Sequence, residues 1–328
     1  MPERKNDFVS FLSLFKRYKG QSCQAVTRPK ISVIIPVYNR ELLVRNAVQS
    51  VLDQSFVDFE LVVVDDASTD ETVGEILSFH DDRIRVVRKN QNGGNASARN
   101  IGIQESKAEL ITFLDSDDSF DRDFLEKVVS TAEQFPDIFF FWAGVQFVNS
   151  EQQFLRKETW TPKGRLPGLT FFEELRIGTN NGLTVRRAVT ETVGFFDENL
   201  KASVDRDFLL RISQNFKGDL VRDVFVNVLI GTHDSVRKNY SDQAEAYNHL
   251  IKKYKSIIYS KSRLKAWWLH KALWLNLYSG NKMQAFNYLK SLGFPIKSSM
   301  VFSTFLLLPN ESARKIHKMF AKKGISRS

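Results

Sequence analysis

The sequence of 328 residues contains one cysteine, Cys23, so no disulfide can form within the chain. This absence favours a reducing compartment. The chain also lacks any apolar run near the roughly 20 residues that a transmembrane helix needs. One of the longest, VFSTFLLLP at 301–309, is about half of that length. The beginning, MPERKND, is too charged for a signal peptide. These features predict a cytoplasmic protein.

Several catalytic motifs are absent as well. The sequence has no G-x-G for a dinucleotide-binding turn and no G-x-x-x-x-G-K-[ST] for a P-loop. It also has no H-E-x-x-H, no C-x-x-C and no G-x-S-x-G. Kinases, NAD-dependent dehydrogenases, zinc hydrolases and serine hydrolases therefore lose their strongest sequence evidence.

Acidic residues are scarce at the end of the chain. Residues 251–328 hold 16 Lys and Arg and one acid, Glu311, whereas the residues before them hold 31 basic and 37 acidic side chains. This basic segment is also rich in Trp and Tyr. Such a composition suits an anionic membrane surface or a nucleic acid, but a packed helical appendage with a solvated basic face explains it equally well. Of these partners we expect the membrane surface and not nucleic acid.

Hydrophobic patterning predicts alternating strands and helices from Ile31 onward. Continuous apolar strands that alternate with helices are typical of a parallel sheet covered on both faces, which indicates an α/β fold. The predicted strands of the first half are 31–36, 59–66, 83–88 and 109–115, and the predicted helices are 40–53, 69–79, 95–106 and 121–135. Asn39 is a plausible N-cap for the first of these helices.

The second half is less regular, with a β-prone segment at 137–148, a helix at 206–215 and a strand at 224–230. From about residue 240 the pattern is helical, with breaks near 279–281 and 293–295. We therefore divide the chain into three parts. These are an N-terminal amphipathic helix and linker (1–30), an α/β domain (31–235) and a basic, aromatic-rich helical tail (236–328).

Polar residues follow each of the first four predicted strands, as PVYN, DDASTD, NQNGGNASARN and DSDD. In an open parallel sheet, ligands bind at the carboxyl ends of the strands. The acids of DSDD, Asp115, Asp117 and Asp118, must repel one another there unless a cation balances them. Mg²⁺ and Mn²⁺ take oxygen ligands from one or two carboxylates and from substrate phosphates. The cluster therefore predicts a divalent cation whose other partner is a pyrophosphate.

The segments VIIPVYNR, ELVVVDDASTDET, GGNASARNIGI and ITFLDSDD occur in this order along the chain. Together they resemble the nucleotide-binding half of a bacterial-type family 2 glycosyltransferase with the GT-A fold. The resemblance covers about residues 31–235 and is strongest over 31–120. It implies a mostly parallel central sheet flanked by helices, here followed by a C-terminal helical appendage.

The resemblance also implies an inverting transferase that uses Mn²⁺ or Mg²⁺. The donor would be a nucleotide-diphosphate sugar, with UDP favoured, and the acceptor a hydroxyl of a glycan or lipid-linked saccharide in polysaccharide or cell-surface glycan synthesis. Processive members carry Q-x-x-R-W and membrane-spanning helices, which are absent here, so we expect a non-processive enzyme. A lipid-linked acceptor and the basic tail would suit a peripheral location on the inner face of the plasma membrane.

The family's donor-binding residues can be carried over by position. Pro36 and Tyr38 stand where the family packs against the base and ribose, although Tyr38 could also be an ordinary strand-end aromatic. Asp66 matches the acid that accepts a hydrogen bond from the imide N–H of uracil or thymine. Arg99 would either neutralise phosphate or hold the acid cluster. The other donor-binding candidates are Asn39, Asp65, Gly94, Asn95, Asp115 and Ser116, with Asp65 expected to order its loop.

The segment SVDRDFLLRI matches the family's catalytic acid before a late helix, which makes Asp205 the candidate general base. Val204 replaces the acid that commonly stands beside it. The alternative is that Asp205 N-caps the helix, a role that is compatible with catalysis. His233 matches a family histidine over the donor phosphates and is a candidate metal ligand, or else an ordinary surface or core residue. Asn181 lies in a segment that resembles the acceptor side.

Two alternative functions remain open. A sugar-phosphate nucleotidyltransferase shares the architecture but would need a glycine-rich loop where PVYNRELL stands. A non-catalytic protein that binds nucleotide sugars would account for Val204 and for the basic tail.

Overall fold

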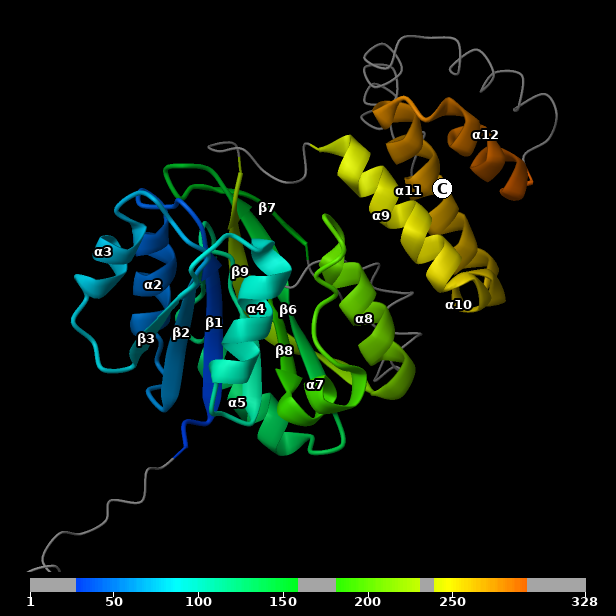
Figure 1. Ribbon diagram of the computed structural model, residues 1–328. Helices are drawn as coiled ribbons and strands as arrows, with labels where there is room; N and C mark the ends of the chain where they lie inside the picture. Colours follow the sequence, from blue (N-terminus) through cyan, green and yellow to red (C-terminus); the bar gives the residue numbers. More distant parts are fainter. Residues whose placement is uncertain (1–27, 159–180, 231–238, 294–328) are drawn as a thin grey trace, which may run out of the picture.

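A computed structural model describes residues 28–158, 181–230 and 239–293 of the chain. The helix expected at 7–18 lies outside these residues. The described strands form one sheet with the order β3-β2-β1-β4-β8-β6-β9-β5, and β7 pairs with β6 (Figure 1). The strands are β1 (Ile31–Val37), β2 (Phe59–Asp65), β3 (Ile84–Arg88), β4 (Leu110–Phe113), β5 (Ser119–Phe120), β6 (Phe140–Val148), β7 (Phe154–Glu158), β8 (Leu183–Arg186) and β9 (Gly218–Leu229).

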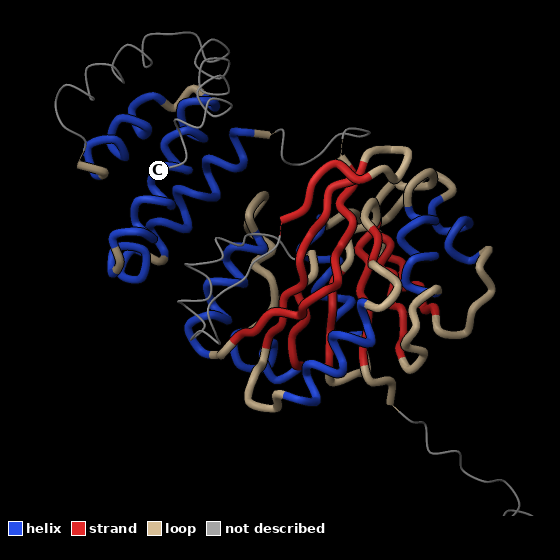
Figure 2. The backbone as a smooth tube through the Cα atoms, turned by 180° about the vertical axis from the view of Figure 1, so that it is seen from behind, coloured by secondary structure: helices blue, strands red, loops and turns tan. Residues whose placement is uncertain are grey.

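Helices cover both faces of this sheet, as the alternating pattern predicts (Figures 1 and 2). Side chains of β1 alternate between two hydrophobic cores, since Ile34 belongs to one cluster and Ile31, Val33 and Ile35 belong to the other. The helices are α2 (Val44–Leu52), α3 (Thr72–Leu77), α4 (Gly94–Glu105), α5 (Phe124–Gln134), α7 (Arg187–Val193), α8 (Val204–Asn215), α9 (Tyr240–Lys253), α10 (Lys255–Ser260), α11 (Ser262–Ser279) and α12 (Lys282–Ser291).

The first half of the sheet is parallel, because β1 pairs in parallel with β2 and β4, and β2 with β3. Helix α4 lies close against this part. A Cβ atom added at Gly102 would stand 2.4 Å from Cγ2 of Ile34, so only glycine allows this approach. In the second half, β8 pairs antiparallel with β4 and β6, while β9 runs parallel to β6. The predicted α/β fold is confirmed, and the sheet is mixed in the region where the sequence pattern is irregular.

Helix α2 begins four residues later than predicted. Asn39 adopts a left-handed conformation (φ 50°), and the residue that precedes the first turn of α2 is Leu43. The prediction that Asn39 N-caps this helix is therefore wrong. The main chain turns at Asn39 before the helix starts, and its side chain bonds to a neighbouring loop, as described below.

The predicted helical tail is present over the described residues 239–293. The break expected near 279–281 is confirmed, because α11 ends at Gly280 (φ 89°) and the Asn281 side chain caps α12 by accepting the N–H of Gln284. None of the helices in the described ranges is both long and apolar enough to cross a bilayer.

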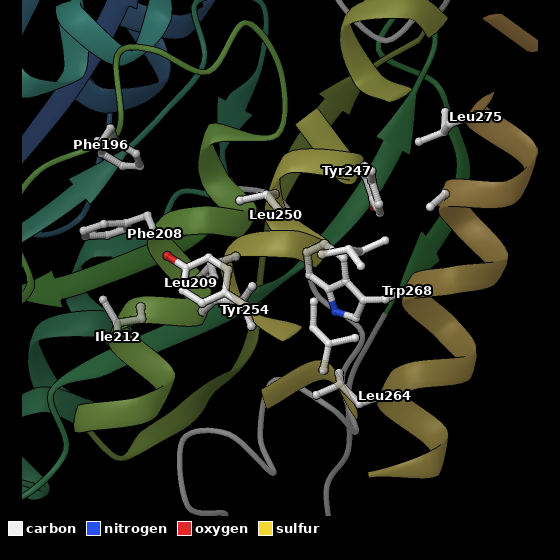
Figure 3. Packing of buried hydrophobic residues seen from close by; sticks show 14 of the residues in the cluster. Phe196, Phe208, Leu209, Ile212, Tyr247, Leu250, Tyr254, Leu264, Trp268 and Leu275 are labelled. Carbon is white, nitrogen blue, oxygen red and sulfur yellow. The ribbon is translucent and has the colours of Figure 1, made fainter. Parts of the chain in front are cut away.

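Helices α9–α12 form a group beside α8 and share a hydrophobic core with it (Figures 1 and 3). This cluster includes Phe208 and Leu209 of α8, Tyr247 and Leu250 of α9, and Trp268 of α11. Several aromatics that suggested a membrane surface are thus buried: Trp268 is fully buried and Trp274 is 8% exposed. The described part of the tail is therefore a packed appendage. The domain boundary at 235 lies outside the described residues and stays a prediction.

Candidate functional site at the carboxyl ends of the strands

The parallel register of β1, β2 and β4 brings three predicted segments to one edge of the sheet. Pro36 is buried within β1, and Tyr38 follows it at the edge with 43% of its surface exposed. The N–H of Asp66 bonds to the carbonyl of Val37 at 2.8 Å, which places Asp66 next to the end of β1. Tyr38 therefore presents an accessible ring beside a buried carboxylate.

Asn39 connects the loop after β1 to the loop after β2. Its N–H donates to the Ser68 hydroxyl at 2.9 Å, and its side-chain oxygen accepts the N–H of Thr69 at 2.9 Å. Asp65 is buried and accepts the N–H of Ser68 at 3.1 Å, so it orders its own loop as expected. These contacts give Asn39 and Asp65 a role in shaping the edge.

Asp66 anchors the turn that begins α4. One carboxylate oxygen accepts the N–H of Gly93 at 2.9 Å and the ammonium of Lys89 at 2.5 Å, and the other accepts the N–H of Gly94 at 2.7 Å. Gly94 has a φ of 82°, which favours glycine. A carboxylate has about four acceptor positions, so one remains for another donor. The expected contact with a nucleotide base stays a prediction.

The acids after β4 form a cluster. Asp115, Asp117 and Asp118 each offer a carboxylate oxygen, and these three atoms lie within 4.8 Å of one another. Asp118 is buried, and its oxygens accept the side-chain amide of Asn181 at 2.5 Å and the N–H of Leu229 at 3.0 Å. Asp118 therefore also connects the cluster to the segments before β8 and at the end of β9.

Arg99 of α4 lies behind this cluster. It is 4% exposed, and its guanidinium donates to Asp115 at 2.6 Å. One of the two expectations for Arg99 was that it holds the acid cluster, and its salt bridge to Asp115 is present. This salt bridge keeps the Asp115 side chain in one orientation. Ser116 beside it is buried, whereas Asn95 in the first turn of α4 is exposed.

Asp205 is the second residue of α8. The residue that precedes this helix is Ser203, with a left-handed φ of 57°, and the Asp205 carboxylate accepts the N–H of Arg206 at 3.0 Å. The alternative that Asp205 is the N-cap is therefore wrong. His233 lies outside the described residues.

The electrostatic surroundings of Asp205 connect it to the acid cluster. Burial raises the pKa of Asp205, the positive charges of Arg206 and Arg99 lower it, and the negative charge of Asp115 raises it. Packing connects the two parts as well. The guanidinium of Arg99 donates to Asp115 and lies 5.8 Å from the ring centre of Phe196, whose ring centre is 4.4 Å from that of Phe208 in α8. The acid cluster and α8 are therefore linked through Arg99 and Phe196.

The donor set of the cluster fits a hard divalent cation. It consists of carboxylate oxygens alone, which Mg²⁺ and Mn²⁺ prefer over the softer metals. Asp115 and Asp117 are half-buried, and Asp118 stands behind them with both oxygens already hydrogen-bonded. Asp115 and Asp117 are therefore the more accessible candidate ligands.

Sequence reasoning missed some residues that shape this site. Lys89 directly follows β3, and its ammonium donates a hydrogen bond to the Asp66 carboxylate. In the sequence, the only indication of this contact is a basic residue at the end of a predicted strand. Phe196 exchanges hydrogen bonds with the Asn100 side chain at 2.9 and 3.0 Å, which fixes the segment before α8 against α4. No periodicity marks Phe196, because the contact joins residues almost a hundred positions apart.

The sequence profile described as "Glycosyl transferase family 2" matches residues 32–194, from β1 through α7. The chain belongs to glycosyltransferase family 2. The matched stretch includes the edge residues Tyr38, Asp66, Arg99 and the acid cluster. Asp205 lies beyond it.

This family 2 glycosyltransferase is similar to curated bacterial proteins. It is 42% identical over 102 residues to the putative teichuronic acid biosynthesis glycosyltransferase TuaG of Bacillus subtilis, which covers 30% of this chain and 40% of that protein. It is 30% identical over 187 residues to an uncharacterised glycosyltransferase of Haemophilus influenzae, which covers 56% of this chain and 62% of that protein. The matches span less than two thirds of these relatives.

A solved structure supports the fold. The structure of residues 1–349 of TarS from S. aureus in complex with UDP-GlcNAc aligns with a TM-score of 0.62 at 21% identity, over 80% of each chain. At this identity the likeness shows the fold alone. The predicted GT-A architecture of this family 2 glycosyltransferase is thereby confirmed.

Proposed function

We propose that this chain transfers one sugar from a nucleotide-diphosphate donor to a hydroxyl group of a glycan or lipid-linked saccharide, with inversion at the anomeric carbon. The observation that carries the proposal is the cluster of three carboxylates at the end of β4, which Arg99 and Phe196 link to the helix that carries Asp205. The cluster is suited to a metal and a diphosphate, and Asp205 supplies a further carboxylate close to it. UDP is the favoured nucleotide, in keeping with the fold likeness to TarS crystallised with UDP-GlcNAc.

In this proposal the donor lies along the edge formed by β1, β2 and β4. Tyr38 offers an exposed ring for stacking on a pyrimidine, and Asp66 keeps one acceptor position for the base N–H. The Gly93–Gly94 turn, fixed by Asp66, lets the main chain approach the donor. Pro36, Asn39 and Asp65 support this edge from inside.

Asp115 and Asp117, with Asp118 behind them, would hold Mg²⁺ or Mn²⁺. When bound, the ion supplies positive charge that stabilises the leaving diphosphate. Arg99 holds Asp115 in position for this task. Whether His233 completes the site stays a prediction.

Asp205 acts as the general base. Its carboxylate takes the proton of the acceptor hydroxyl while the hydroxyl oxygen forms a bond to the anomeric carbon and the bond to the diphosphate breaks. Burial raises the pKa of Asp205, which makes the carboxylate a better proton acceptor at neutral pH. One displacement step inverts the anomeric configuration.

The test is nucleoside diphosphate release from a panel of UDP-, GDP- and dTDP-sugars, with and without Mn²⁺ or Mg²⁺. We expect turnover of at least one donor, and we expect Asp205→Asn to lower its rate by about 10²–10⁴-fold while donor binding by calorimetry is retained. The control is Asp137→Asn, an exposed acid paired with Lys217. Donor binding without turnover would favour the non-catalytic alternative, and absence of binding would refute the proposal.

The relatives suggest a biological setting. TuaG is named for teichuronic acid biosynthesis, and we propose that this chain likewise acts in bacterial polysaccharide or cell-surface glycan synthesis. We further propose a location at the inner face of the plasma membrane, with the lysines and arginines of the tail meeting anionic lipid. Flotation with anionic liposomes tests this, because binding through charge must weaken in high salt.

A further inference from the structure

The first turn of α8 is held by the helical tail. Three consecutive residues of this turn, Asp205, Arg206 and Asp207, have side chains in three different environments. Asp205 is influenced by the charges of Arg99 and Asp115 in the candidate site, Arg206 contacts aromatic rings of the tail, and Asp207 is buried among charged side chains. Successive residues of an α-helix are about 100° apart around its axis, which follows from 3.6 residues per turn. Fixing Arg206 and Asp207 therefore also fixes the direction of Asp205.

Asp207 is fully buried and accepts hydrogen bonds from two residues of the tail. The ammonium of Lys253 donates at 2.8 Å, and the hydroxyl of Tyr254 donates at 2.7 Å to the same oxygen. Arg211 of α8 donates to the other oxygen at 2.8 Å. A buried carboxylate with charged donors on both oxygens has little freedom to move. It connects α8 to the end of α9.

Arg206 is held from the same side. Its guanidinium carbon lies 5.4 Å from the ring centre of Tyr247 in α9 and 5.0 Å from that of Trp267 in α11. These distances allow cation–π attraction. Arg206 also provides the positive charge closest in sequence to Asp205, so its position affects the charge balance of the candidate base.

The chain just before α8 indicates that contacts outside the helix fix its start. Ser203 has a φ of 57°, which residues other than glycine seldom adopt. Such a conformation persists where the surroundings determine it. The surroundings here include the shared core of Phe208, Leu209 and Trp268 (Figure 3).

We propose that helices α9 and α11 position the Asp205 carboxylate for proton transfer. Lys253 and Tyr254 are positioning residues that act through Asp207, and Tyr247 and Trp267 are positioning residues that act through Arg206. The tail is then part of the catalytic unit. This inference rests on the proposed function, because it gives the tail a task in the same reaction.

The experiment compares substitutions within the tail of the full chain. Lys253→Met and Tyr254→Phe each remove one donor to Asp207, whereas Lys252→Met and Tyr259→Phe make the same chemical changes at exposed neighbouring positions. With the UDP-sugar that the wild type turns over, we expect the first pair to lower kcat by about 10-fold or more with donor KM unchanged. We expect the control pair to match the wild type.

A double-mutant cycle separates positioning from general stability. If Lys253 acts through Asp205, then Lys253→Met must cost nothing further in kcat when Asp205 is already replaced by asparagine. Equal losses in both backgrounds overturn the inference. Should Lys253→Met fail to fold, Lys253→Arg, which keeps a charged donor, must retain activity and Tyr254→Phe must still show the non-additive loss.

The two proposals fail in distinguishable ways. A wild type that turns over a donor while Lys253→Met and Tyr254→Phe match it would overturn the positioning role alone. A wild type that neither binds nor turns over any donor would overturn the proposed function, and the positioning role would fall with it.

Discussion

Asp66 offers a direct test of how the donor edge is built. Asp66→Asn keeps the shape of the side chain but removes one oxygen and the charge. The amide nitrogen that takes the place of this oxygen cannot accept the N–H of Gly94, which keeps only its longer bond of 3.2 Å to the side-chain oxygen of Asn92. Losing a hydrogen bond to a charged group costs about 1.5–3 kcal/mol. The bond to Lys89 loses its ionic partner, and hydrogen bonds to charged groups contribute about 1.5–3 kcal/mol.

Since the remaining oxygen still accepts the N–H of Gly93 and, without its charge, the ammonium of Lys89, we expect Asp66→Asn to lower the free energy of unfolding by about 3 kcal/mol. At about 2–4 °C per kcal/mol, the melting temperature falls by about 6–12 °C. Because the Gly93–Gly94 turn loses its anchor, donor affinity should also fall about 10-fold or more, equivalent to about 1.4 kcal/mol.

Urea unfolding and titration calorimetry measure the two effects. Asp58→Asn, an exposed acid next to β2, serves as the matched control and should stay within about 0.5 kcal/mol of the wild type. If Asp66→Asn unfolds with the same free energy as this control, the hydrogen bonds to Gly93, Gly94 and Lys89 do not hold the edge together. The reasoning would then be wrong.

Three further predictions concern Asp205, Gly102 and the acid cluster. Because the folded protein raises the pKa of Asp205, its charged form destabilises the fold above the ordinary value of 3.8. Asp205→Asn should therefore melt at or above the wild-type temperature at pH 7, with the gain vanishing near pH 3; a lower melting temperature at pH 7 would contradict this. Gly102→Ala should destabilise by about 1–3 kcal/mol in thermal unfolding, since the new methyl group meets Ile34, and a neutral result would contradict the close packing of α4. Chelation with EDTA should abolish donor turnover, and Mn²⁺ or Mg²⁺ should restore it; full turnover in EDTA would exclude the cation from the reaction.

The parts of the fold that were predictable are those that depend on short stretches of sequence. The run ISVIIP predicts β1 because a strand covered on both faces needs apolar residues on both. The parallel register alone places Asp115 at the same edge of the sheet as the loop after β2. The helices of the tail follow from periodicity, and Gly280 marks the end of α11 as expected.

What could not be predicted depends on contacts between distant residues. The Asp66 carboxylate accepts hydrogen bonds from main-chain N–H groups 27 and 28 positions later in the chain. No pattern of side chains in the sequence indicates such bonds. The sequence predicted that Asn39 caps a helix. Its side-chain oxygen instead accepts the N–H of Thr69 in the loop after β2. The Trp residues of the tail suggested contact with a lipid surface. In the structure, Trp268 and Trp274 instead belong to a hydrophobic core shared with α8. Burial against protein removes hydrophobic surface from water just as contact with lipid would.

The interior place of β9 has a consequence for dissecting the protein. This strand lies between β6 and β5, and the N–H of Leu229 at its end bonds to Asp118. A fragment that stops where the family match stops, at residue 194, would open the sheet along β6 and leave one oxygen of that aspartate without its main-chain donor. The stretch most readily recognised by similarity is therefore not a minimal folding unit, and expression work should retain the chain at least through β9.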